Sequence, residues 1–317
     1  MDDGLEKKDF VFYKNPSDIK LSSDSIFGKI EKKWKEMELI SAKRDRVTKE
    51  LKYFLKDCSV LFVKDQRIQV YIDKKNEITL FTLANDLKLK MNLAISEYNK
   101  ISQELDATFP IRLFDSSVRP DYSMIEERLK GLKNVRHNYI KYGLLDESNN
   151  TKFNFQDLDL SKKNESAHVL KLYADDNLIK YSAFDSLTKK INLFIRFLNS
   201  KELAFKKVVV HKEVGFCLVD ESGVAIELSD LSSGEQNQII MLYNLIFLTN
   251  ANTIVLIDEP EISLHVAWQK EVLTNLESVM KINSMPQMII ATHSPTLING
   301  SWDRTLDLYE ISKLGLN

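Results

Sequence analysis

The sequence predicts an α/β fold, with a mostly parallel core sheet, an antiparallel β part and a mainly helical part. Two apolar runs, at 253–258 and 287–292, have the length and β-branched content of strands buried on both faces. Residues before about 200 are instead rich in Lys, Glu, Asn and Leu in amphipathic helical patterns. We therefore expect three segments: an N-terminal helical and β-hairpin segment at 1–80, a mainly helical lobe or insertion at 81–205, and a C-terminal core at 206–317.

Further elements of the first two segments follow from periodicity and turn residues. Apolar positions at helical spacing predict helices over 25–55, 87–105, 124–142 and 183–198, and Gly143 is placed to cap the third of these. A polar, Asn- and Asp-rich stretch at 146–165 predicts a loop. Short β-branched and aromatic runs predict strands at 59–63 and 68–72, joined as a hairpin, and a strand at 169–173.

The C-terminal segment alternates strands with helices. Strands are expected at 208–210, 216–219 and 224–228, with a hairpin turn at 220–223 between the last two. We expect helices at 237–248 and 266–279, and a third core strand at 305–311. The antiparallel part would then comprise about 59–73, 168–174 and 206–228.

Composition excludes several classes of protein. The chain has 317 residues with 44 Lys and Arg against 46 Asp and Glu, a balance that argues against a protein whose whole surface binds nucleic acid. Its two cysteines, Cys58 and Cys217, have no metal-ligand spacing and form no disulfide framework, which favours a reducing, cytoplasmic setting. No apolar run approaches 18 residues, so we expect no membrane-spanning helix and no membrane partner.

Two carboxylates follow the first apolar strand. Asp258 and Glu259 come directly after 253–257, and Pro260 then forces the chain to turn. Ligands of open parallel sheets bind at the carboxyl ends of the strands. Asp258 is therefore a candidate Mg²⁺ ligand, and Glu259 a candidate general base that orients and deprotonates a water. The alternative is a strand that ends in acidic residues without a catalytic role.

A second candidate site lies about twenty residues earlier, where Leu231-Ser-Ser-Gly-Glu-Gln236 opens a helical pattern. A hydroxyl at Ser232, a glycine at Gly234 and the unpaired amides of a helix start together form an anion cradle. An ordinary N-cap with Glu235 in the first turn explains the same residues.

The second apolar strand ends at His293, followed by Ser294 and Pro295. A single histidine is usually structural, but this one terminates the next core strand after the acidic one. It is therefore placed to contact a γ-phosphate or an attacking water.

These pieces, in this order, resemble the ABC ATPase superfamily over roughly 206–311. Residues 231–235 resemble its signature motif, with Ser233 in place of the first glycine, and 254–259 resemble Walker B with its catalytic glutamate. Residues 263–265 fall at the D-loop, and His293 at the switch histidine. The resemblance implies nucleotide-binding roles for a set of five residues: Ser232, Ser233, Gly234, Glu235 and His265.

The amino-acid sequences of these motifs resemble those of the RecF, SMC and OLD-like ATPases, and within that group those of the Septu-type and retron-associated defence ATPases. The resemblance implies that two heads associate face to face, with ATP and Mg²⁺ held between Walker motifs of one head and the signature of the other. It further implies a separate nuclease subunit of the HNH type as effector, with any DNA or RNA contact made through partners.

One expected motif is absent: the sequence contains no Walker A loop, Gly-x-x-x-x-Gly-Lys-Ser/Thr. The nearest stretch, 23–30, lacks the first glycine and ends in Ile30. Three explanations stay open: a Walker A segment upstream of Met1, a naturally split head completed in trans, or a degenerate head that senses or scaffolds. Retention of Glu259, His293 and the signature favours the first two.

Two other functions compete with an ATPase that controls an effector. One is a non-catalytic scaffold or sensor that holds a nuclease or a retron partner. The other is a RecF-like DNA repair ATPase, for which the pairs Lys189-Lys190 and Lys206-Lys207 are weak support, since such runs are usually solvated surface.

Overall fold

The computed structural model describes residues 10–13, 59–63, 70–72, 76–77, 80–115, 122–147, 167–199, 203, 205–263, 269 and 271–309, and it confirms the α/β class. The chain divides into two compact units. We name them the sheet unit (1–80, 200–204 and 230–317) and the helical unit (81–199 and 205–229). These units are not the three segments expected at 1–80, 81–205 and 206–317, and that division of the chain stays a prediction.

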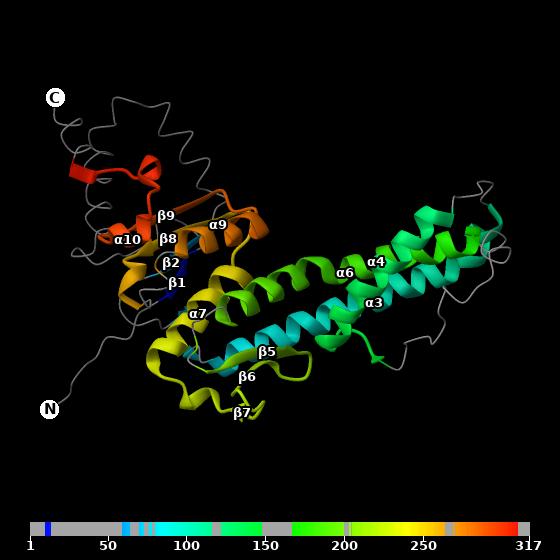
Figure 1. Cartoon of the computed structure of the whole chain (residues 1–317), viewed down its shortest axis with the longest axis horizontal. Helices are drawn as coiled ribbons and strands as arrows, with labels where there is room; N and C mark the ends of the chain where they lie inside the picture. Colours follow the sequence, from blue (N-terminus) through cyan, green and yellow to red (C-terminus); the bar gives the residue numbers. More distant parts are fainter. Residues whose placement is uncertain are drawn as a thin grey trace. The chain divides into compact units, whose positions relative to one another are not determined.

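The sheet unit is built on a six-stranded sheet of order β4-β3-β1-β2-β8-β9. Its strands are β1 (Phe10–Tyr13), β2 (Ser59–Val63), β3 (Val70–Ile72), β4 (Asn76–Glu77), β8 (Thr253–Asp258) and β9 (Gln287–Ala291). β2, β8 and β9 are parallel neighbours, which confirms a parallel core through 253–258 and 287–291 (Figure 1). All but one residue of β8 are buried, as the apolar run predicts.

The sheet corrects two predicted pairings. The hairpin expected between 59–63 and 68–72 is wrong, because β1 lies between β2 and β3 in the sheet. The assignment of 59–63 to a separate antiparallel part is only half right, since β2 pairs antiparallel with β1 but runs parallel to β8 in the core sheet, with Val60 opposite Ile254. Residues 60–63 are all buried, and such a run of buried residues is typical of a parallel strand covered on both faces.

The end of the sheet departs from the prediction as well. β9 is the last strand in the sheet order of the described residues, and Ile289 is 41% exposed, so this strand is not buried on both faces. The strand expected at 305–311 is wrong for its described part, 305–309. The chain forms a short 3-10 helix, η7 (Trp302–Arg304), then three residues without regular structure, and residues 308–309 are helical, with Asp307 accepting a hydrogen bond from the Tyr309 amide. Leu306 is 79% exposed, so no burial holds this segment as a core strand.

Three α-helices and two 3-10 helices complete the described sheet unit beside η7. They are η5 (Leu228–Asp230, which spans the boundary between units), α7 (Ser233–Phe247), η6 (Pro260–Ser263), α9 (Val272–Asn283) and α10 (Pro295–Ile298). α7 begins four residues before the predicted 237, and α9 ends at 283 instead of 279. Buried Asn283 joins the two helices, because its amide donates to the carbonyls of Leu245 and Ile246 and to the Thr249 hydroxyl.

The helical unit contains three long helices, α3 (Leu80–Asp115, whose first residue belongs to the sheet unit), α4 (Tyr122–Lys141) and α6 (Ala167–Asn199), which lie alongside one another (Figure 1). The predicted strand at 169–173 is wrong, since these residues lie in the first turns of α6. Leu170, Ala174, Tyr181 and Phe184 are buried, and their spacing follows one helical face. Gly143 ends α4 with φ of 70°, and the Leu144 amide donates to the Tyr139 carbonyl, which confirms the predicted cap.

A three-stranded antiparallel sheet of order β5-β6-β7 completes the helical unit. Its strands are β5 (Lys207–His211), β6 (Gly215–Val219) and β7 (Ala225–Ile226), and the Asp220 carboxylate closes the predicted turn by accepting from the amides of Ser222 and Val224. One face is buried, and Phe216 packs edge-on against Phe194 of α6 at 5.6 Å between ring centroids.

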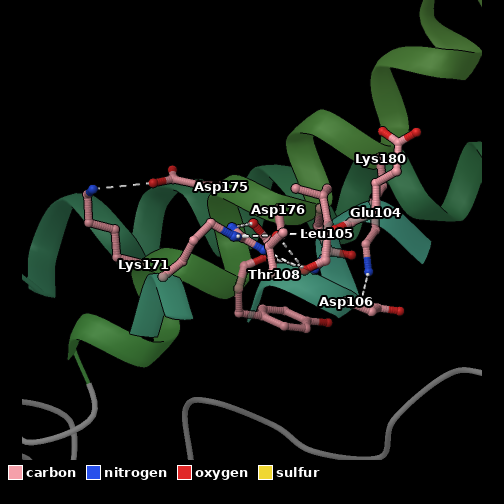
Figure 2. A network of polar contacts seen from close by, with 11 residues as sticks. Glu104, Leu105, Asp106, Thr108, Lys171, Asp175, Asp176 and Lys180 are labelled. Atoms are coloured by element: carbon pink, nitrogen blue, oxygen red, sulfur yellow. Dashed lines mark hydrogen bonds and ion pairs between the residues drawn. The ribbon is translucent and has the colours of Figure 1, made fainter. Parts of the chain in front are cut away.

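A polar network joins α3 to α6 (Figure 2). The Arg112 guanidinium pairs with both oxygens of Asp176, whose side chain is 7% exposed, and also donates to Thr108 Oγ1 and the Leu105 carbonyl. The hydrogen bond to Asp176 raises the pKa of Arg112, so the guanidinium stays charged. Pro110 lies within α3, so the helix lacks one amide donor at that position, close to where Arg112 attaches it to α6.

Two predictions fall largely outside the described residues: the helix over 25–55 and most of the loop at 146–165. None of the helices in the described ranges is long and apolar enough to span a membrane.

Candidate functional site

The candidate site forms where two parallel strands of the sheet unit end side by side. β8 delivers Asp258, which is 5% exposed, and Glu259 follows it with φ of 45°. A left-handed backbone is uncommon for a residue with a side chain and is concentrated at functional positions. The Glu259 amide donates to the Ala291 carbonyl at 2.8 Å, so the strained residue is held to the end of β9.

Glu259 and His293 come together at this edge of the sheet. Glu259 Oε1 lies 3.5 Å from His293 Nε2, and the two side chains are 25% and 77% exposed. The carboxylate is thus half-buried, while the imidazole is open to solvent. A water or phosphoryl oxygen that approaches this edge meets an acceptor and an imidazole together.

A third acidic residue, Glu261, belongs to the same cluster and was missed in the sequence. Its Oε1 accepts from the Thr292 hydroxyl at 2.6 Å and from the His293 amide at 3.0 Å. Gln269 adds a hydrogen bond to the Glu261 carbonyl at 3.2 Å. Nothing local in the sequence indicates the contacts with Thr292 and His293, because these partners are more than 30 residues from Glu261 and meet it only once β8 and β9 are parallel neighbours.

Residues 232–235, expected to act as a signature motif, form a separate cluster at the N-terminus of α7. Ser232 caps the helix: its hydroxyl accepts from the Glu235 amide at 3.3 Å, while Glu235 Oε2 accepts from the Ser232 amide at 2.9 Å. This is a complete capping box, so the N-cap reading of these residues is confirmed as their role within the chain. Ser233 and Gly234 are exposed beside it.

The chemistry of the strand-end residues fits a magnesium nucleotide. Mg²⁺ prefers carboxylate oxygens and commonly takes one or two of them, with phosphate and water oxygens completing its shell. Asp258 and Glu259 supply such oxygens at the edge of the sheet. Within the described ranges, no group of three His, Cys, Asp or Glu side chains is placed to hold a metal ion by itself. His265 lies outside the described residues.

The basic pairs considered for nucleic-acid contact lie in the helical unit. Lys189 is exposed, whereas Lys190 is only half-exposed, and burial together with nearby Lys90 lowers its pKa. Lys207 is exposed on β5, and Lys206 is half-exposed just before it.

Comparison with known proteins indicates an ATPase domain. The chain is 33% identical over 89 residues to the Retron Ec83 probable ATPase of Escherichia coli, a match that covers 25% of this chain and 16% of the relative. Residues 77–299 match the family described as "AAA domain, putative AbiEii toxin, Type IV TA system". That match takes in residues 231–236, β8 with its acidic end, β9 and His293, and such a domain implies nucleotide binding, normally with Mg²⁺. The chain therefore belongs to this family of AAA-type ATPase domains and is related to a retron-associated ATPase.

Proposed function

We propose that the chain is the ATP-hydrolysing part of an anti-phage defence complex, and that its nucleotide state controls an associated effector. Asp258 holds Mg²⁺, Glu259 acts as the general base on the attacking water, and His293 contacts the γ-phosphate or that water. The family match and the related retron ATPase support an ATPase with a defence role.

The observation that carries the proposal is the pairing of Glu259 with His293. The two residues come from different strands, yet their side chains lie 3.5 Å apart at the ligand-binding edge of a parallel sheet. A general base must be exposed enough to reach water and held firmly enough to orient it. Glu259 meets both conditions, because its side chain is 25% exposed and its amide is bonded to β9.

The signature is proposed to act across a pair of heads. Gly234 supports this, because an added Cβ would meet no heavy atom within 4 Å, so the packing of the chain itself does not require glycine there. A glycine beside exposed helix-start amides lets a phosphate approach the backbone closely. Ser232, Ser233, Gly234 and Glu235 would then read the ATP bound by a second head, with His265 at the D-loop contributing to the same interface.

The Walker A loop is proposed to be supplied by a segment upstream or by a partner chain. Retention of Glu259 as the base and of His293 as the switch histidine supports a site that still binds phosphates, because a degenerate site would need neither residue. The effector is proposed to be a separate HNH-type nuclease subunit, with any DNA or RNA contact made through partners, in the cytoplasm.

The test is Mg-ATP turnover by the complex purified from its host, with Glu259→Gln as the variant. Loss of a general base should lower kcat by about 10²- to 10⁴-fold while ATP stays bound and the heads stay paired. Glu277→Gln is a matched control, because Glu277 lies in α9 of the same unit and pairs with Arg304 of η7 instead of with the strand-end residues. Turnover by Glu259→Gln at the parent rate would refute the assignment of the base.

A non-catalytic scaffold is the second candidate, and one observation favours it. The Ser232 hydroxyl and Glu235 are occupied with each other in the capping box, which leaves them fewer groups to offer a nucleotide. A complex that assembles unchanged without nucleotide and contains no bound ATP would support this function over hydrolysis.

A further inference from the structure

The Glu261 carboxylate connects the two segments that carry the candidate site, which are the end of β8 and the end of β9. Glu261 lies in η6, directly after the acidic end of β8, and its Oε1 accepts two hydrogen bonds from the end of β9. One comes from the Thr292 hydroxyl at 2.6 Å and the other from the His293 amide at 3.0 Å. A single oxygen therefore fixes the backbone on which the His293 side chain is mounted.

A second layer of contacts holds the same junction. Thr292 Oγ1, which donates to Glu261, also accepts from the Ser294 amide at 3.0 Å. Gln269 spans the two sides, since its amide nitrogen donates to the Glu261 carbonyl at 3.2 Å and its oxygen accepts from the Ser294 hydroxyl at 3.4 Å. The network thus runs from η6 through the residues on both sides of His293.

We propose that Glu261 is a positioning residue that holds His293 against Glu259. The proposal deepens the proposed function, because it explains how an exposed imidazole stays within 3.5 Å of the general base. His293 has its amide bonded to Glu261, and Glu259 has its own amide bonded to Ala291. Each residue is therefore anchored by its backbone to the neighbouring segment, and the two side chains meet between these anchors.

The negative charge of Glu261 matters to this role. Hydrogen bonds to an ionised acceptor are stronger than neutral ones, and this oxygen accepts two at once. The other oxygen, Oε2, is buried and has no hydrogen-bond partner among the residues that the structure describes. A glutamine at this position would weaken the two bonds, because its amide oxygen is a neutral acceptor, so the conservative Glu261→Gln is a sharp variant despite its nearly equal size.

The test measures amide hydrogen exchange at 292–294 in the full chain, and ATP turnover and nucleotide affinity in the host-purified complex. Glu261→Gln and Thr292→Val should speed exchange at the His293 amide by roughly tenfold, since each weakens the network that protects it. Thr292→Ser, which keeps the hydroxyl, should restore protection, and Glu277→Gln should change nothing. In turnover, kcat should fall at least tenfold with nucleotide affinity within twofold of the parent.

Each outcome decides one of the two proposals. Unchanged exchange at His293 in both Glu261→Gln and Thr292→Val would overturn the positioning role. A loss of nucleotide affinity as large as the loss of kcat would also overturn it, because Glu261 would then hold the ligand directly. If the parent complex hydrolyses no ATP, the proposed function fails, and hydrogen exchange still decides whether Glu261 fixes His293. If Glu261→Gln does not fold, the comparison of Thr292→Val with Thr292→Ser carries the same test.

Discussion

Substituting Gly234 by alanine separates an effect on the stability of the fold from an effect on nucleotide turnover. An alanine Cβ at this position meets no heavy atom within 4 Å, and the residue lies in the first turn of α7 without a positive φ. The substitution removes backbone freedom from the unfolded chain, so the folded state should be as stable as the parent or more stable, by up to about 1 kcal/mol. If the exposed amides of this turn contact a phosphate of a second head, the same methyl group blocks that approach. Losing one such donor should lower kcat by roughly 10²- to 10³-fold.

The assay pairs chemical denaturation with Mg-ATP turnover of the purified complex. Gly131→Ala is the matched control, because Gly131 also lies in a helix with open space around its Cβ position, in α4 of the helical unit. The control should gain about 1 kcal/mol of stability and keep its turnover. A Gly234→Ala complex that is stable and turns over ATP at the parent rate would refute the claim that a nucleotide approaches this glycine.

Two further predictions test the helical unit. Gly215→Ala should destabilise the protein by about 3 kcal/mol or more, because φ is 74° and the new Cβ would lie 1.8 Å from the Ala84 carbonyl oxygen. Urea unfolding measures this loss, and a loss of less than about 1 kcal/mol would contradict the close approach of α3 and β6. Asp176→Asn should lower the free energy of unfolding by about 2 kcal/mol, since it replaces a mostly buried partner of the Arg112 guanidinium by a neutral one. In the Asp176→Asn background, Arg112→Gln should then lower the free energy of unfolding much less than it does in the parent. Strictly additive effects of the two substitutions would refute the pairing.

The fold was predictable where a sequence pattern has a single interpretation. The run at 253–258 is apolar, rich in β-branched residues and too short for a helix, and it forms β8. The run at 169–173 has two interpretations, because Val-Leu-Lys-Leu-Tyr fits a strand over five residues and a helix once Ala174, Tyr181 and Phe184 are counted. The helical alternative is realised because it buries those residues along one face of α6.

Strand pairing was less predictable than strand location. Residues 59–63 were expected to be a strand and form one, but their neighbours are β1 and β8, the second more than 190 residues away, and not the strand next along the chain. The choice of partner depends on burial: Leu61 is fully buried and Val60, Phe62 and Val63 nearly so, which requires a position inside the sheet. A hairpin at the edge would have left one face in water.

The same distinction between local pattern and distant pairing applies to the candidate site. Glu259 and His293 were predicted because each directly follows its own strand, and the parallel arrangement then brings two strand ends together. Glu261 stands next to the same motif, yet its hydrogen bonds reach Thr292 and the backbone of His293, and only the register of β8 with β9 creates them. The sequence thus locates the groups that would do the chemistry, whereas the fold supplies the contacts that hold them in place. An exposed histidine such as His293, 77% open to solvent, depends on those contacts more than a buried one does, because no packing restrains its side chain.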